Sequence, residues 1–194
     1  MKIIDEPKYG PMFRFSDANV YWTLHLLSDG TRTGRKRLSD MVGIGEGSMR
    51  RIIDALREMD LISIKQTGVA ITEKGIEFLE DIPIRVIELD VGDSVAGEET
   101  QSLLVLGVSD KVHNGMQQRD AGIKVGATSC TTFVIRDGIL MVPPDWNVDL
   151  EKPELAKIIR DEFGMSEKDA IIVGGASTKA LAIEASVAAA LEII

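Results

Sequence analysis

Cationic side chains cluster in one short stretch of the chain, where they could bind the phosphate groups of a nucleic acid. Residues 32–51 hold six lysines and arginines against two acidic residues, Asp40 and Glu46. Guanidinium and ammonium groups pair with phosphate oxygens, and this attraction supplies much of the affinity of proteins for DNA. The cationic residues are Arg32, Arg35, Lys36, Arg37, Arg50 and Arg51. The stretch therefore favours binding to duplex DNA.

A helix beginning near Ser48 would hold the last two arginines on its solvent face. Its apolar residues recur at helical spacing and form one stripe, which consists of Met49, Ile52, Ile53, Leu56 and Met59. At about 100° per residue, Gly47, Arg50 and Arg51 lie on the opposite face. We expect this face to reach DNA, with Gly47 and Ser48 permitting a close approach.

The residues before this helix predict a helix-turn-helix. Ser16 is a plausible cap for a first helix, and Leu38 and Val42 indicate a second. Gly43 and Gly45 then interrupt the chain before the arginine-bearing helix. Two short helices joined by a tight turn are typical of helix-turn-helix proteins.

The residues after it predict a wing and a closing helix. Residues 62–71 change to a β-compatible pattern with a turn near Gly68, which is typical of a hairpin and places Lys65 at the tip. Thr72 can cap a helix over residues 73–80, whose Ile76 and Leu79 we expect to return to the core. The order of elements predicts an N-terminal winged helix-turn-helix.

Eight residues are predicted to contact DNA in this arrangement. They are Arg35, Lys36, Arg37, Gly47, Ser48, Arg50, Arg51 and Lys65. Arginines on a helix can also form a merely solvated face, and winged helices also serve as protein contacts. The ordered set of elements favours DNA over both alternatives.

The net charge of −9 does not oppose this interpretation, because the negative charge lies elsewhere. Residues 1–81 carry 12 basic and 13 acidic side chains, whereas residues 82–194 carry 10 and 18. Charges separated by more than about 10 Å are largely screened at ordinary salt. The local basic patch can therefore attract phosphate while the second half of the chain is acidic.

Composition indicates a soluble, cytoplasmic protein. With 194 residues and 44% hydrophobic positions, the chain can form two modest domains. It has no apolar run long enough to span a membrane and no signal-peptide pattern. Its one cysteine, Cys130, and two histidines predict neither a disulfide nor a zinc site, and we expect no metal or cofactor.

A domain boundary is expected at Pro83, which cannot continue the closing helix. This divides the chain into a DNA-binding domain over residues 1–82 and a second domain over residues 83–194. In the second domain, short β-compatible runs alternate with helical ones, including a single helix over residues 150–163. The fold class is therefore α+β or α/β, with a C-terminal domain that resembles ligand-binding domains.

Residues 173–179 could form an anion site in the second domain. They read as a strand end, two glycines, two hydroxyl residues and a lysine at a helix start: Gly174, Gly175, Ser177, Thr178 and Lys179. A lysine in the first turn opposes the helix dipole unless an anion binds there. The spacing does not match a nucleotide-hydrolysing loop. The alternative is a plain tight turn with a hydroxyl cap.

A second candidate ligand site follows Gly115. Arg119 beside two glutamines offers a fork for an anionic or amide-bearing ligand, and Thr131 and Thr132 could add hydroxyls. Asp120 and Lys124, four residues apart, would join this site or form an ordinary solvated helix pair.

The last helix, over residues 178–192, is apolar almost all round. Such a helix must be buried on most sides. It lies either in the centre of its domain or partly in a dimer interface.

Three segments of the chain resemble a family of archaeal proteins. These are Gly34–Leu38, Gly43–Arg50, and Gln118–Ala127 with Thr131 and Thr132, and the string from Arg119 to Ala127 is the most specific. Proteins of this family join a winged helix to a C-terminal domain of unknown function and are described as transcriptional regulators. The resemblance implies a regulator and supplies no ligand.

These observations predict a transcriptional regulator that is not an enzyme. We expect an N-terminal winged helix that binds double-stranded DNA, a C-terminal domain that binds a small, anionic effector, and a homodimer that reads two half-sites. One alternative is a small enzyme acting on a phosphorylated or carboxylated metabolite, although no nucleophile with its base is visible. Another is a protein-interaction adaptor.

Overall fold

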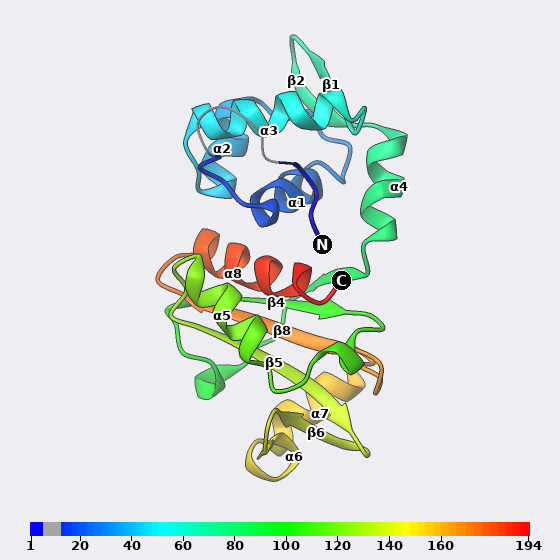
Figure 1. The fold of residues 1–194 in the computed structure, drawn as a ribbon, viewed down its shortest axis with the longest axis vertical. Helices are drawn as coiled ribbons and strands as arrows, with labels where there is room; N and C mark the ends of the chain where they lie inside the picture. Colours follow the sequence, from blue (N-terminus) through cyan, green and yellow to red (C-terminus); the bar gives the residue numbers. More distant parts are fainter. Residues whose placement is uncertain (6–12) are drawn as a thin grey trace. The chain divides into compact units, whose positions relative to one another are not determined.

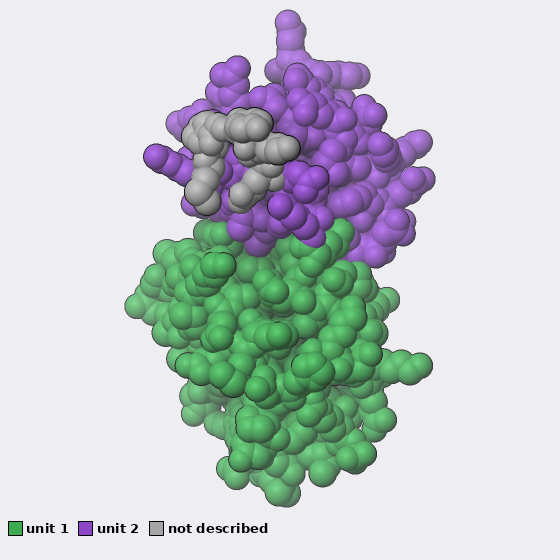
Figure 2. Space-filling view, in the orientation of Figure 1, with its two compact units in different colours: residues 1, 83–194 green, residues 2–82 purple. Residues whose placement is uncertain are grey.

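The computed structural model describes residues 1–5 and 13–194, and these fall into two compact units. One unit comprises residues 2–82, and the other comprises residue 1 with residues 83–194. Figure 2 shows the two units in separate colours. No helix in the described ranges is long and apolar enough to cross a membrane.

The N-terminal unit contains the predicted helices, hairpin and closing helix in the expected order (Figure 1). Its elements are α1 (Asp17–Leu26), α2 (Arg35–Val42), α3 (Glu46–Glu58), β1 (Ile62–Lys65), β2 (Gly68–Ile71) and α4 (Glu73–Asp81). Gly43 ends α2 in the left-handed region with φ 77°, where its N–H donates to the Ser39 carbonyl. Glycine adopts this conformation without steric cost, which permits the tight turn into α3.

The predicted apolar stripe of α3 is buried. Met49, Ile52, Ile53 and Leu56 form its covered face, and Met59 at the C-cap is half-buried. Thr72 caps α4 as expected, since its hydroxyl accepts a hydrogen bond from the Gly75 N–H at 3.1 Å.

The expected return of α4 to the core is wrong for Ile76. This side chain is 39% exposed, and Gly75 is the residue of α4 that is buried. A Cβ on Gly75 would lie 2.2 Å from the Leu61 carbonyl oxygen. The face of α4 that approaches the hairpin is therefore the glycine face, and Ile76 points away from it.

The C-terminal unit is built on one six-stranded sheet whose order is β3-β4-β8-β5-β6-β7. The strands are β3 (Ile84–Ile87), β4 (Glu99–Val105), β5 (Ser129–Arg136), β6 (Ile139–Val142), β7 (Trp146–Asn147) and β8 (Ala170–Ala176). Every neighbouring pair is antiparallel. Of the two expected classes the unit is therefore α+β, because α/β folds are built on parallel strands.

Helices cover both faces of this sheet. The longer helices are α5 (Met116–Lys124), α6 (Val148–Glu151), α7 (Pro153–Asp161) and α8 (Lys179–Leu191). Helices α5 and α8 contact each other and the central strands on one face (Figure 1). The other face carries an apolar core in which Phe133 and Ile171 of the sheet pack with Leu155 and Ile159 of α7. The strands β5 and β8, which lie between these layers, are buried almost throughout.

One expected helix is divided in the structure, and two short helices were not predicted. The helix predicted over residues 150–163 is divided into α6 and α7, because Pro153 begins a new helix. Two short 3-10 helices, Gly92–Ser94 and Ser109–Lys111, lie in connections that contained no predicted element.

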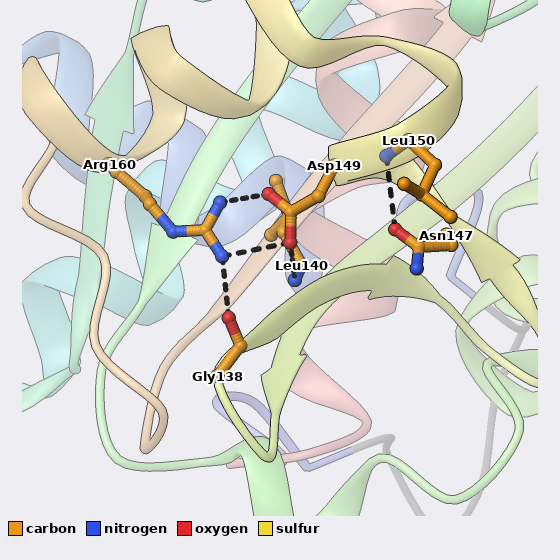
Figure 3. A network of polar contacts seen from close by, with 6 residues as sticks. All are labelled: Gly138, Leu140, Asn147, Asp149, Leu150 and Arg160. Atoms are coloured by element: carbon orange, nitrogen blue, oxygen red, sulfur yellow. Dashed lines mark hydrogen bonds and ion pairs between the residues drawn. The ribbon is translucent and has the colours of Figure 1, made fainter.

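An ion pair between Asp149 and Arg160 joins α6, α7 and the β5–β6 hairpin (Figure 3). Two guanidinium nitrogens of Arg160 bind the two carboxylate oxygens of Asp149. The same guanidinium donates to the Gly138 carbonyl at 2.8 Å, and Asp149 accepts from the Leu140 N–H at 2.7 Å. The hydrogen bonds from Arg160 hold the pKa of Asp149 below its ordinary value. Bidentate geometry makes this pair stronger than most surface ion pairs.

Replacing Asp149 should therefore destabilise the protein in a pH-dependent way. A carboxyl group whose pKa is lowered by folding stabilises the folded state above its unfolded pKa, about 3.9, and this contribution is lost as the pH falls through the lowered value. Asp149→Asn should reduce the free energy of unfolding by about 1–3 kcal/mol at pH 7. The difference should shrink below about pH 4.

Urea unfolding of both proteins at pH 7 and pH 3 measures this effect. Asp145→Asn is the matched control, because Asp145 is exposed and has no partner among the described residues. Equal destabilisation by the two substitutions at pH 7 would contradict the assigned role of the Asp149–Arg160 pair.

Candidate functional site

The solvent face of α3 carries the cations that the sequence placed there. Arg50, Arg51 and Gly47 are exposed, and Ser48 is half-buried. The apolar residues on the opposite face of α3 are buried in the core. The arginines can therefore bind a ligand without disturbing the packing of the helix.

The start of α2 adds three exposed cations, Arg35, Lys36 and Arg37. No side chain caps this helix, whose N-cap residue is Gly34. Cations in the first turn are repelled by the positive end of the helix dipole. An anion bound there would offset this repulsion and accept hydrogen bonds from the free N–H groups. Arg35 also pairs with Glu46 of α3 at 3.4 Å, so part of its charge is neutralised.

A cleft of about 710 Å³ lies where the turn meets α3. Its lining comprises Arg14, Gly43, Ile44, Gly45, Gly47, Ser48 and Arg51. The Ser48 hydroxyl donates to the Arg14 carbonyl at 3.3 Å, which brings the segment before α1 next to the start of α3. Arg14 was not predicted, because it precedes every periodic element and only the folded chain places it beside Ser48.

The hairpin β1–β2, which we call the wing, adds Lys65 near its exposed turn. The backbone of Thr33 pairs with Val69 and so extends the wing by an isolated bridge. Arg32 contacts this region through a long hydrogen bond of 3.5 Å to the Gly68 carbonyl. The wing therefore presents Lys65 next to its turn, and Arg32 contacts Gly68, the residue that pairs with Lys65.

The prediction that Gly174 and Gly175 form an open anion-binding turn is wrong. Both residues lie inside β8, which pairs with β4 on one side and β5 on the other. A Cβ on Gly174 would lie 2.4 Å from the Ala182 carbonyl oxygen, and one on Gly175 would lie 2.1 Å from the Ala96 carbonyl oxygen. These glycines permit close packing and leave no N–H groups open to an anion.

Ser177, Thr178 and Lys179 follow this strand at the surface. Thr178 is the N-cap of α8, since its hydroxyl accepts from the Leu181 N–H at 3.3 Å. The Lys179 ammonium donates to the Thr100 carbonyl at 2.5 Å. The lysine therefore has a partner within the protein, and its position in the first turn does not require an anion.

The second predicted site is not assembled as one pocket. Arg119, Asp120 and Lys124 are exposed on α5, whereas Thr132 is buried. In the part of the chain that the structure describes, no ion pair joins Asp120 to Lys124. Thr131, the neighbour of Thr132, lies on the opposite face of the sheet, because side chains alternate along a strand.

Helix α5 instead turns Gln118 and Gly122 inward. A Cβ on Gly122 would lie 2.5 Å from the Cys130 Cβ, so this glycine allows α5 to approach β5. Gln118 is 1% exposed, and neither its Nε2 nor the Thr132 hydroxyl has a hydrogen-bond partner among the described residues. Burial raises the pKa of the Cys130 thiol to about 12, so the thiol is neutral and unreactive at neutral pH.

Residues 1–5 and 13–194 contain no group of three His, Cys, Asp or Glu side chains that could hold a metal ion. Among the described residues, the groups that could bind a ligand lie on the cationic surface of the N-terminal unit and in clefts of the C-terminal unit.

Comparisons with known proteins match two parts of the chain. Residues 19–85 match the model of the CggR N-terminal DNA binding domain, and residues 95–193 match a domain of unknown function, DUF4443. The chain thus joins an N-terminal DNA-binding domain to a sheet-rich C-terminal domain. It belongs to the DUF4443 family. The resemblance inferred from the sequence is confirmed.

A solved structure shares this fold. A hypothetical protein from the archaeon Pyrococcus horikoshii OT3 is 24% identical, with 93% of each chain covered and a TM-score of 0.71. No curated protein matches the chain.

The packing role of Gly174 leads to a stability prediction. Gly174→Ala should lower the free energy of unfolding by about 1–3 kcal/mol, because the added methyl group collides with the backbone of α8. Gly47→Ala is the control, since a Cβ there meets nothing within 4 Å. The control should be neutral or slightly stabilising because alanine favours helix. Chemical denaturation measures both, and an unchanged stability of Gly174→Ala would contradict the close-packing role.

Proposed function

We propose that this protein is a transcriptional regulator whose N-terminal unit is a winged helix that reads duplex DNA. The observation that carries the proposal is the exposed face of α3, where Arg50 and Arg51 lie opposite a fully buried apolar stripe. Side chains that face away from the core of a helix-turn-helix can enter the major groove.

The surrounding cations fit the phosphate backbone. In this proposal α3 enters the major groove, where its arginines bind guanine edges or phosphates. Arg35, Lys36 and Arg37 at the start of α2 contact the phosphates beside the groove, and Arg14 lines the cleft next to Ser48. Lys65 of the wing contacts a phosphate further along the duplex. Phosphate contacts position the protein, and base contacts provide specificity.

The C-terminal unit would serve regulation. We propose that it binds a small effector, that two copies of the chain act as a homodimer on two half-sites, and that the protein works in the cytoplasm with the DNA. Helix α8 offers little surface for the dimer, because most of its apolar residues are buried within the chain. An effector changes DNA affinity only by the difference in its own affinity for two states of the protein.

Removing the arginines of α3 tests the DNA interface. Arg50→Ala with Arg51→Ala should weaken DNA binding by about 1–3 kcal/mol for each arginine that reads a base. Exposed substitutions of this kind usually change stability by less than about 0.5 kcal/mol. Fluorescence anisotropy with a DNA duplex over a series of salt concentrations measures the affinity and its salt slope.

A double variant of equal charge change provides the control. Lys157 and Lys168 are exposed in the C-terminal unit, so Lys157→Ala with Lys168→Ala removes two positive charges far along the sequence from α3. We expect this control to bind DNA like the wild type. If only the control binds DNA more weakly, or if both variants bind like the wild type, α3 is not the recognition helix. Such a result would favour an adaptor that binds protein.

Sedimentation velocity tests the homodimer. At micromolar concentration, the complex with DNA that carries two half-sites should have the mass of the duplex plus two copies of the 21.2 kDa chain. A monomer bound alone to such DNA would contradict the proposed pairing of two half-sites.

A further inference from the structure

A cleft of about 400 Å³ opens within the C-terminal unit, between the end of β3 and the start of β4. Its lining residues are Val86, Ile87, Glu88, Leu89, Asp90, Thr100, Gln101, Ser102 and Lys179. The chain leaves the β3–β4 ladder after Ile87, which pairs with Ser102, and this divergence opens the space. Its size falls in the range of small-molecule sites, roughly 300–1,000 Å³.

Charges of both signs face this cleft without neutralising one another. Lys179 donates one hydrogen bond to Thr100, and an ammonium group has three donors. Glu88 is exposed, and Asp90 uses one carboxylate oxygen to accept from the Gly92 N–H at 2.9 Å. Within the described ranges, no ion pair joins Lys179 to either carboxylate. Donor and acceptor capacity of opposite charge therefore remains open in one small space.

The remainder of the cleft is apolar or held in place by hydrogen bonds. Val86 is half-buried and provides the aliphatic surface of the cleft, because side chains alternate along β3 and Ile87 and Leu89 pack into the apolar core. Gln101 is 6% exposed, and its Nε2 donates to the Ser102 carbonyl at 2.9 Å. The polar base of the cleft is thus fixed before any ligand arrives, which lowers the entropic cost of binding.

We propose that this cleft binds a zwitterionic amino acid with an aliphatic side chain. The ligand carboxylate pairs with Lys179, its ammonium group pairs with Glu88 and Asp90, and its side chain packs on Val86. The inference rests on the effector role in the proposed function and names the chemical class of that effector.

The two carboxylates exclude the simpler ligand that the sequence suggested. A purely anionic ligand would gain the attraction of Lys179 but would also meet repulsion from Glu88 and Asp90, since like charges at close range oppose binding. A purely cationic ligand would be attracted by Glu88 and Asp90 but repelled by Lys179. A zwitterion satisfies both signs, and an aliphatic side chain also gains from burial against Val86.

Three matched compounds test the ligand class by titration calorimetry on the full chain. L-leucine carries both charges, 4-methylpentanoate lacks the ammonium group, and 3-methylbutylamine lacks the carboxylate. We expect leucine to bind at least about tenfold more tightly than either of the others, a difference of about 1.4 kcal/mol. Equal binding of leucine and either single-charge compound, or no leucine binding at millimolar concentration, would overturn the proposal.

Two variants assign the charges within the cleft. Lys179→Met should weaken leucine binding about tenfold but strengthen 3-methylbutylamine binding, because it removes a like charge. Glu88→Gln should weaken leucine binding but strengthen 4-methylpentanoate binding for the same reason. Lys124→Met and Glu151→Gln, at exposed positions outside the cleft, are the controls and should bind leucine like the wild type. Thermal unfolding confirms that each variant is folded.

If neither cleft variant changes the affinity for leucine, the leucine site does not lie in this cleft. These outcomes are separate from the DNA interface, because calorimetry without DNA reports the cleft alone. Loss of DNA binding in the Arg50 and Arg51 variant would leave the cleft result standing, and failure of leucine to bind would leave the DNA interface standing.

Discussion

The burial of one apolar stripe along α3 is the constraint on which the cationic surface of the N-terminal unit depends. Once Met49, Ile52 and Leu56 enter the core, the rotation of the helix about its axis is determined, because about 100° separates successive side chains. Arg50 and Arg51 then face solvent by the same geometry. Gly43 supports this arrangement, since its left-handed backbone turns the chain between α2 and α3. Hydrophobic burial thereby orients the charged groups that we propose to bind DNA.

Close backbone packing has the corresponding role in the C-terminal unit. Gly174 lies against α8 and Gly122 lies against β5, and at both positions a side chain would collide with its neighbour. These contacts hold α5 and α8 on one face of the sheet, while α7 closes the apolar core on the other face. The Asp149–Arg160 pair ties the β5–β6 hairpin to this second layer. With both faces covered, open surface remains at the strand ends and the connections, where the cleft beside Lys179 lies.

Charge is divided between the units in a way that suits different ligands. The basic patch of the N-terminal unit is local, so it can attract phosphate although the whole chain is acidic. In the C-terminal unit, carboxylates outnumber cations along the sequence, and the cleft at Lys179 carries both signs. To regulate DNA binding, an effector in this cleft would need different affinities for the DNA-bound and the free protein. Electrostatics thus favours DNA for one unit and a zwitterion for the other.

The sequence by itself determined the elements whose pattern is local. The stripe of α3, the cap Thr72 and the exposed arginines all follow from spacing within a few residues, and the structure contains them. Tertiary structure alone decided the roles of Gly174 and Gly175, the antiparallel order of the sheet and the partner of Lys179. The two glycines could equally have allowed an unusual turn or a close approach, and only neighbours distant in sequence, such as Ala182 and Ala96, distinguish these uses. Local periodicity encodes which face of an element is buried, whereas contacts between distant segments decide what that face meets.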